Sequence, residues 1–477
     1  RANAVFYPSL PESAHACIAV NSWLTDSNRC IFLVSDSITK AESWGEDVTG
    51  FGEQLFPQVN IHFHLFDEAP IRTHPDAFDR NCERASVLSL LTEFADEESL
   101  DERLVIATTP EALRSPCLAL NESQASELKI SAGQEVDFAL FTQKLAEELD
   151  YASEILCEEP GQFSVRGGLI DVYPVNATHP YRIDFFGDEI EEIKTFDPTS
   201  QRTEGSVPSI RISSSKLEES TLKEGGLFDY IKKPTTWVFQ EPELMTSQFP
   251  LCFHSADKVS HAKVTLAELW SGSRIEMNTY LGFSEIDAGN GIFKDAARKE
   301  LVIHPWIRQV GFDPSGNDLS KVLHNEQGRR VSRLFQLLKI QNEQNCEVVI
   351  TAGANSETKR IQDIISDESS LQRLTPKFLP LGLSEGFLCP APSAGENLKS
   401  LLSDQSKGIL LATSREILGR ERSRRPIRSR KAHVQRKEVD QALDFSELVE
   451  GDYLVHHQHG ICRFCQMGKI EDDSITE

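Results

Sequence analysis

The sequence lacks any apolar run long enough to cross a bilayer. It also has little positive charge, because 49 lysines and arginines stand against 74 aspartates and glutamates, a formal net charge of −25. The phosphate backbone of DNA attracts cations, so the negative net charge argues against general DNA binding by the chain as a whole. We therefore expect no membrane partner, and we expect DNA contacts to be minor.

Cysteine is sparse, with ten residues spread thinly over 477 positions. Such spacing is typical of reduced thiols in a cytosol and not of a disulfide scaffold, so we expect a cytoplasmic protein. Single hydrophobic cores stop growing beyond about 250–300 residues, which predicts several domains. The chain begins at Arg1 and stops at Glu477 without a helix cap or a terminal tail, and we expect it to be a fragment.

A phosphate-binding loop is missing as well. Residues 1–135 alternate apolar strand-like runs with helical patterns, which predicts a mostly parallel α/β sheet of the kind that often binds nucleotides. The pattern G-x-x-x-x-G-K-[ST] does not occur, since the only Gly-Lys pair, Gly468-Lys469, is followed by Ile470. Asp67-Glu68 imitates an acidic Mg²⁺ pair, but a strand-end turn is favoured by about ten to one. We expect no cofactor and no catalytic residue in this chain.

What is present is a small antiparallel β module over residues 161–203. Alternation over residues 181–186 and 189–196 predicts two strands, and Gly187-Asp188 supplies the tight turn of a hairpin. Gly167-Gly168 interrupts an upstream strand-like run and predicts a β-bulge there. Before the module, a helix is expected to bury one stripe of apolar residues: Val136, Leu140, Leu145 and Leu149.

Three residues of this module form the candidate binding patch. Arg182 and Phe186 share one face by strand alternation, and Arg166 lies on the neighbouring strand. An arginine beside an exposed aromatic residue has the composition of an interface hot spot. The structural alternative is that both arginines pair with the hairpin's acidic residues, Asp184, Asp188 or Glu189, and that Phe186 belongs to the core.

The segments VRGGLIDVYP, YRIDFFGDEIEEIKTFDP and TSQRT of this module closely resemble the module shared by two bacterial families. These are the nucleotide-excision component B and the transcription-repair coupling factor, and in both the module docks excinuclease component A. The resemblance implies that Arg166, Arg182 and Phe186 contact component A. It also implies that residues 136–212 are inserted into a degenerate nucleotide-binding-like α/β domain made of residues 1–135 and 213–317.

Two further segments follow the first domain. Residues 318–419 predict a second small α/β domain of unknown role, with strands over 347–352 and 408–412 and a helix over 357–365. Residues 420–442 form a basic linker, for which a solvated connection is favoured over a DNA-contacting arm at roughly two to one. If the linker does contact DNA, five residues are its candidates: Arg424, Arg425, Arg428, Arg430 and Lys431.

The sequence GDYLVHHQHGI, within residues 443–477, resembles the start of the RNA-polymerase-interaction domain of transcription-repair coupling factors. The resemblance implies an incomplete, truncated CarD-like β barrel, with Ile470 on the surface that contacts the polymerase β subunit. Cys462 and Cys465 depart from the family pattern and form a C-x-x-C pair near histidines. We place zinc binding at about one in eight, so no metal site is expected.

The two resemblances, in this order, imply a multidomain α/β plus β chain that is the amino-terminal half of a bacterial transcription-repair coupling factor. The implied function is that of an adaptor in transcription-coupled nucleotide excision repair, which binds stalled RNA polymerase and recruits excinuclease component A. The fragment would not be an enzyme. The ATP-driven DNA translocase, with its ATP, Mg²⁺ and most DNA contacts, would lie beyond Glu477. Two alternatives stay open: a stand-alone polymerase-binding transcription regulator, or an enzyme related to excision component B or to nucleotide-dependent helicases.

Overall fold

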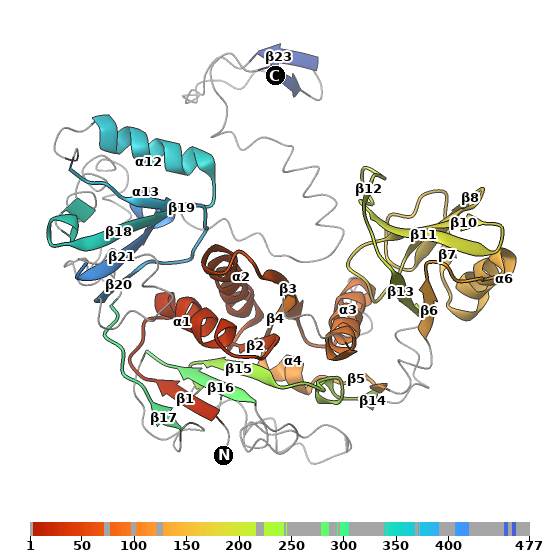
Figure 1. Cartoon of the computed structure of the whole chain (residues 1–477), viewed down its shortest axis with the longest axis horizontal. Helices are drawn as coiled ribbons and strands as arrows, with labels where there is room; N and C mark the ends of the chain where they lie inside the picture. Colours follow the sequence, from red (N-terminus) through yellow and green to blue (C-terminus); the bar gives the residue numbers. More distant parts are fainter. Residues whose placement is uncertain are drawn as a thin grey trace, which may run out of the picture. The chain divides into compact units, whose positions relative to one another are not determined.

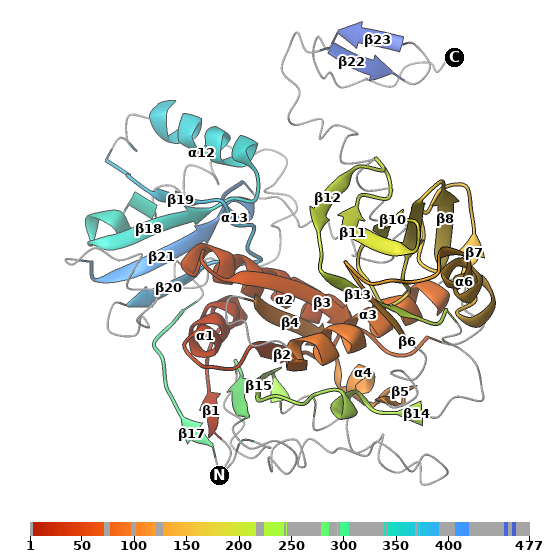
Figure 2. The ribbon, with the colours of Figure 1, turned by 45° about the vertical axis from the view of Figure 1, so that its right-hand side comes forward.

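The computed structural model (Figures 1 and 2) describes residues 3–70, 77–96, 102–120, 127–215, 224–242, 278–285, 296–304, 341–367, 373–390, 406–418, 453–456 and 460–463, with residues 245, 293, 338, 339 and 371. The chain forms two compact units, residues 1–426 and 427–477. Each unit is a separate body. Among the described residues, no helix has both the length and the apolar character needed to cross a membrane.

A seven-stranded parallel sheet organises the first part of the chain, in the order β17-β1-β16-β15-β2-β4-β3. Its strands come from two separate stretches of sequence. The first stretch supplies β1 (Asn3–Tyr7), β2 (Cys30–Val34), β3 (Asn60–Phe66) and β4 (Glu102–Thr108), and the second supplies β15 (Thr235–Gln240), β16 (Thr279–Phe283) and β17 (Ala297–Arg298). The β module is therefore inserted between strands of one sheet.

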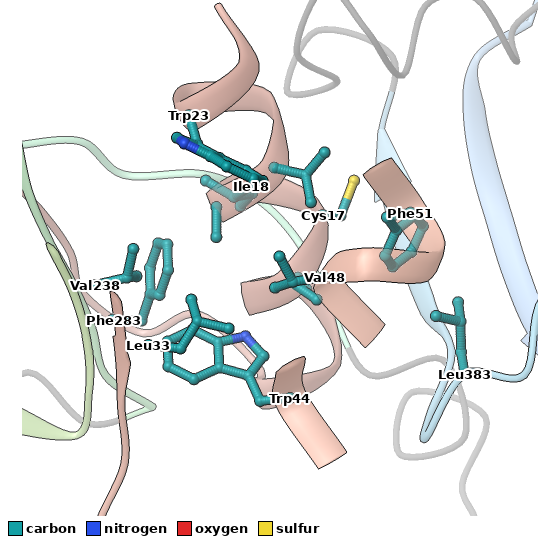
Figure 3. Packing of buried hydrophobic residues seen from close by; sticks show 14 of the residues in the cluster. Cys17, Ile18, Trp23, Leu33, Trp44, Val48, Phe51, Val238, Phe283 and Leu383 are labelled. Carbon is teal, nitrogen blue, oxygen red and sulfur yellow. The ribbon is translucent and has the colours of Figure 1, made fainter. Parts of the chain in front are cut away.

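Helices cover both faces of this sheet, as the alternating apolar runs predicted. On one face, α1 (Glu12–Leu24) and α2 (Ile38–Leu55) bury Trp23 and Trp44 against Leu33 and Phe283, and Figure 3 shows this packing. The other face packs against α3 (Ala77–Asp96) and α4 (Pro110–Arg114). Each layer removes apolar surface from water, which is the main favourable contribution to folding.

The β module is larger than the predicted residues 161–203, and from here the name covers residues 127–213. Its main sheet has six strands in the order β12-β11-β10-β9-β8-β7. Its strands are β7 (Ala152–Ser153), β8 (Gln162–Arg166), β9 (Leu169–Tyr173), β10 (Tyr181–Phe186), β11 (Glu189–Phe196) and β12 (Thr203–Ser206). Two further elements complete the core of the module, the ladder of β6 (Glu127–Ser131) with β13 (Ser209–Ser213) and the helical stretch α6 (Phe138–Gln143) followed by a π-helical turn (Lys144–Glu148).

The module is fixed to α3 through buried groups. Cys82 of α3 belongs to the apolar core of the module. The side-chain amide of Asn176 donates to Ser89 Oγ at 3.1 Å, and its oxygen accepts from the backbone N–H of Ser213 at 3.1 Å. These groups are buried and hydrogen-bonded, so the contact satisfies the polar atoms that it removes from water.

The bulge predicted at Gly167-Gly168 is wrong. Gly167-Gly168 is a two-residue hairpin turn and not a bulge, because Arg166 pairs directly with Leu169. Gly167 has a φ of +62°, and a Cβ on Gly168 would lie 2.8 Å from the Phe185 carbonyl oxygen, so both positions suit glycine. The irregularity lies instead in the hairpin of β10 and β11, where the register shifts between Asp184 and Phe185.

The predicted apolar stripe before the module is also partly wrong. Leu140 is exposed, and Phe141 takes the buried position beside Leu145 and Leu149. The physical reason is spacing: Phe141, Leu145 and Leu149 follow one another at intervals of four residues and share one helical face, whereas Leu140 is five residues from Leu145 and lies off that face.

A second α/β sheet has the order β19-β18-β21-β20. The strands β18 (Cys346–Thr351), β19 (Lys377–Leu379) and β21 (Gly408–Thr413) are parallel, and β20 (Phe387–Pro390) is antiparallel to β21. The helices α12 (Asn355–Asp367) and α13 (Ser414–Leu418) accompany this sheet. One face of this sheet, with Val349 and Leu411, belongs to the same apolar core as α1 and α2. Leu381 and Leu383, between β19 and β20, join that core as well. Ile350 on the opposite face packs in a separate cluster with α12.

The remaining described elements are small. β5 (Cys117–Leu118) pairs with β14 (Glu224–Gly225), and a 3₁₀ turn covers Leu227–Asp229. In the second unit, β22 (Tyr453–His456) and β23 (Gly460–Arg463) form one antiparallel hairpin. The predicted barrel is not shown by these eight residues.

Candidate functional site

The sheet register places Arg166 and Arg182 on the same face of the module. Arg166 pairs with Leu169, which pairs in turn with Asp184, two residues along β10 from Arg182. Directly paired residues project to the same side of a sheet, and so do residues two apart on one strand. We call this side the outer face. The opposite side buries Ile170, Ile183 and other apolar residues in the core of the module.

Phe186 ends β10 on this outer face and is 73% exposed. Its neighbour Phe185 is buried, with its ring 5.1 Å from that of Phe138 in an edge-on arrangement. Gly187 follows with a φ of +65°, which allows the tight turn into β11. Phe186 is therefore not a core residue, and the end of the hairpin presents its ring to solvent.

Arg182 lies on the same face but is held by an ion pair. Its Nε donates to Asp171 Oδ1 at 2.7 Å, and its Nη2 donates to Asp171 Oδ2 at 2.8 Å, a bidentate geometry. The side chain of Asp171 is only 3% exposed and that of Arg182 is 18% exposed. The hydrogen bonds to Asp171 raise the pKa of the Arg182 guanidinium.

Further contacts tie Arg182 to the loop after β11. Its Nη1 donates to the Gln201 carbonyl oxygen at 3.3 Å, and its guanidinium lies 4.8 Å from the centre of the Phe196 ring. The structural alternative predicted that this arginine pairs with an acidic residue, and that is confirmed. The partner is different, because it is Asp171 on β9 and not an acidic residue of the hairpin. Arg182 has a structural role whatever else it contacts.

Arg166 is exposed at the end of β8. Its Nη2 donates to the backbone carbonyl of Ile155 at 3.3 Å. The side chain of Ile155 is 88% exposed, so an apolar residue lies next to Arg166 on the surface. Together, Arg166, Phe186 and the partly exposed Arg182 make a surface that combines cations with an aromatic ring.

The carboxyl edge of the seven-stranded sheet has a different character. Between β1 and α1, Leu10 is completely buried, and its N–H donates to the Ser284 carbonyl at 2.9 Å. Pro8 and Pro11 in the same loop have no N–H to offer. A phosphate cradle requires several free backbone N–H groups, and this short loop does not provide them.

Acidic residues gather at this edge. Burial raises the pKa of the Glu12 carboxyl, and although Lys40 lowers it, Glu285, Glu385 and Glu241 raise it further. Glu241 accepts hydrogen bonds from Ser284 and from the N–H of Glu285. Negative groups of this kind repel phosphates.

Asp67-Glu68, which imitated a Mg²⁺ pair, follows β3 directly. Asp67 Oδ1 accepts the backbone N–H of Glu68 at 2.8 Å, and its Oδ2 lies 3.9 Å from Arg80 Nη1.

The other predicted sites lie mostly outside the described residues. This holds for the basic linker with Arg424, Arg425, Arg428, Arg430 and Lys431, for Ile470, and for Cys465. Cys462 lies in β23, where it pairs with Leu454. Within the part of the chain that the structure describes, no group of histidine, cysteine or acidic residues is arranged to hold a metal ion.

Sequence reasoning missed two residues at this site. Asp171 carries a local signal, because it is the single charged residue in the apolar strand Leu169–Tyr173. Burial of a charge demands a partner, and that rule would have pointed to an arginine on an adjacent strand. Ile155 carries no such signal, since its exposure depends on how its turn folds against β8.

Comparisons with known proteins support the resemblance noted in the sequence. A family described as the UvrB interaction domain matches residues 128–217, the range that contains the outer face. The transcription-repair-coupling factor of Myxococcus xanthus is 25% identical over 425 residues, which cover 76% of this chain and 34% of that protein. The Bacillus subtilis protein of the same name is 20% identical over 514 residues, covering 94% of this chain and 41% of that protein.

A third relative, the transcription-repair-coupling factor of Mycobacterium bovis, is 24% identical and covers 76% of this chain. The chain spans only 33% to 41% of the length of these three curated relatives. The long alignments and the matched interaction domain agree with the order of the two sequence motifs. The chain is homologous to the amino-terminal region of transcription-repair-coupling factors.

Proposed function

We propose that this chain is an adaptor in transcription-coupled nucleotide excision repair, in which the outer face of the β module binds excinuclease component A. Arg166 and Phe186 make direct contacts, and Arg182 contributes through the part of its guanidinium that remains exposed. The carboxyl-terminal segment binds the β subunit of stalled RNA polymerase through a surface that includes Ile470.

The observation that carries the component A proposal is the exposure of Phe186 at the end of β10 within the matched interaction domain. An exposed phenylalanine ring keeps apolar surface in water, and burial by a partner would remove that free-energy cost. Arg166, on the same face and separated from it by β9, supplies a forked donor for partner carboxylates. Aromatic and arginine side chains together are enriched at interface hot spots.

We also propose that this chain itself binds no nucleotide or other cofactor, and the absence of a phosphate loop supports this. The pattern G-x-x-x-x-G-K-[ST] is missing from the sequence, and in the described loop between β1 and α1 two residues are prolines and the N–H of Leu10 is bonded to the Ser284 carbonyl. We propose that ATP, Mg²⁺ and most DNA contacts belong to a motor region that this chain does not cover. A cytoplasmic location follows from that role.

The proposal is tested by binding of purified excinuclease component A to the whole chain and to the variant Phe186→Ala. Truncation of a hot-spot aromatic residue typically costs about 2 kcal/mol, roughly thirtyfold in affinity. We expect that loss, with an unchanged melting temperature because the ring is exposed. Failure of the unmodified chain to bind component A, or unfolding of the module by Phe186→Ala, would contradict the proposal.

The polymerase contact rests on the sequence resemblance and on the homology of the chain to coupling factors. Ile470→Arg is expected to weaken binding to the polymerase β subunit, because it would place a charge where the interface is apolar. Component A binding by the same variant serves as the control and should not change. Equal polymerase binding by the variant and the unmodified chain would exclude this residue from the contact.

A further inference from the structure

The turn that carries Ile155 is held firmly on both sides. Before it, the N–H of Glu154 donates to the Phe163 carbonyl at 2.8 Å, and β7 pairs in parallel with β8. After it, the fully buried Cys157 donates its S–H to the Gln162 carbonyl at 3.3 Å. These hydrogen bonds hold the backbone of the turn, so the Ile155 side chain cannot be buried without breaking some of them.

A single side chain, Gln162, organises the rest of the turn. Its Oε1 accepts the N–H of Glu158 at 3.0 Å and the N–H of Glu159 at 2.9 Å. The result is that Ile155, 88% exposed, and Leu156, 42% exposed, project from a fixed backbone. A contact that is already ordered before binding avoids the entropy cost of ordering it during binding.

Scattered exposed apolar residues are normal on protein surfaces, so the exposure of Ile155 alone would mean little. Its position is what distinguishes it. Its carbonyl oxygen accepts from Arg166, so it adjoins a residue of the proposed component A contact. The turn follows β7, the strand next to β8, and only β9 separates β8 from the strand that ends at Phe186. Neighbouring strands lie about 4.8 Å apart, so these residues fit one continuous interface of ordinary size.

We propose that Ile155, with Leu156 beside it, extends the docking surface for excinuclease component A as a preordered apolar contact. This inference rests on the proposed function. It requires that component A present an apolar hollow for Ile155 next to the carboxylate that faces Arg166. A nucleic acid is a poor occupant, because the acidic Glu154 and Glu158 flank the turn and would repel phosphates.

The test compares component A binding by Ile155→Ala and Ile155→Asp with binding by matched variants of Leu140. Leu140 is 50% exposed in the same module, but it lies on α6, whose Phe141 packs against Phe185 on the core side of the sheet. We expect Ile155→Ala to weaken binding roughly tenfold and Ile155→Asp to weaken it more, as for residues near a hot spot. Leu140→Ala and Leu140→Asp should bind as the unmodified chain does.

Melting temperatures of the Ile155 variants should stay near that of the unmodified chain, since the side chain is exposed. Full-strength binding by Ile155→Asp, while Phe186→Ala loses binding, would overturn this inference and leave the proposed function intact. Equal losses in the Ile155 and Leu140 variants would also overturn it, because the effect would then not be specific to the outer face. Absence of binding by the unmodified chain would overturn both proposals.

Discussion

The carboxyl edge of the seven-stranded sheet and the outer face of the β module differ in the groups that they offer to a binding partner. At the sheet edge, Leu10 is buried and its N–H is already bonded, and carboxylates such as Glu12 occupy the surroundings. On the β module, Phe186 of the outer face is exposed, and so is Ile155 in the turn whose backbone contacts Arg166. A binding surface needs groups whose contacts improve when a partner arrives. The common ligand position of an α/β sheet lacks such groups here, and the inserted module has them.

The largest effect should come from breaking the ion pair that supports the outer face. Asp171→Ala leaves the partly buried guanidinium of Arg182 without its bidentate partner, and breaking a buried pair typically costs about 3–5 kcal/mol. We expect the free energy of unfolding to fall by about 3 kcal/mol, measured by urea denaturation. Arg182→Ala should destabilise similarly, because it leaves the Asp171 carboxylate buried, so this variant is a poor probe of binding alone.

Glu192→Ala is the matched control for this experiment. Glu192 pairs with Lys194 on the same sheet, but both side chains are substantially exposed, so the pair should contribute little. An Asp171→Ala variant as stable as the Glu192→Ala variant would show that the outer face does not depend on the buried pair.

The next effect is a pH dependence that belongs to the sheet edge. His15 is fully buried, stacks on Phe283 and donates from Nε2 to the Leu10 carbonyl at 3.0 Å. Burial lowers the pKa of His15 from 6.5 to about 4. The unfolded chain therefore binds the proton more tightly, and stability is lost as the pH falls from about 6.5 towards 4, by about 3 kcal/mol in total.

This dependence is measured by urea denaturation at several pH values in that window. His15→Gln keeps a side-chain N–H for the Leu10 carbonyl but has no titrating ring, so its stability should change less over the same window. The comparison fails if the unmodified chain and His15→Gln lose stability in parallel. In that case other groups would account for the acid sensitivity.

The smallest expected effect is the response of the chain to ATP. We expect no saturable binding at micromolar ATP and no hydrolysis, because the described loop between β1 and α1 has no phosphate cradle. Titration calorimetry with and without Mg²⁺ would measure it. Saturable binding would mean that the sheet edge retains a ligand site, and the contrast between the two regions would disappear.

Local sequence patterns predicted turns and strand faces well where a glycine or simple alternation fixes the backbone conformation. Gly187-Asp188 marked the turn between β10 and β11, and strand alternation placed Phe186 opposite the buried Phe185. The pattern was wrong at Gly167-Gly168, because a bulge within one strand and a turn between two strands use the same glycines. Which of the two forms depends on the strands that pair, and pairing involves residues far apart in the sequence.

The sequence by itself determined the family resemblance, the missing phosphate loop and the alternation that exposes Phe186. Only the tertiary structure decided that Arg182 is held by Asp171 and that Ile155 adjoins Arg166. The physical reason is that each contact joins residues at least ten positions apart in the sequence, which strand pairing brings together. Strand register decides which side chains lie side by side. A long arginine side chain could reach several acceptors, so the sequence alone does not show which one it bonds.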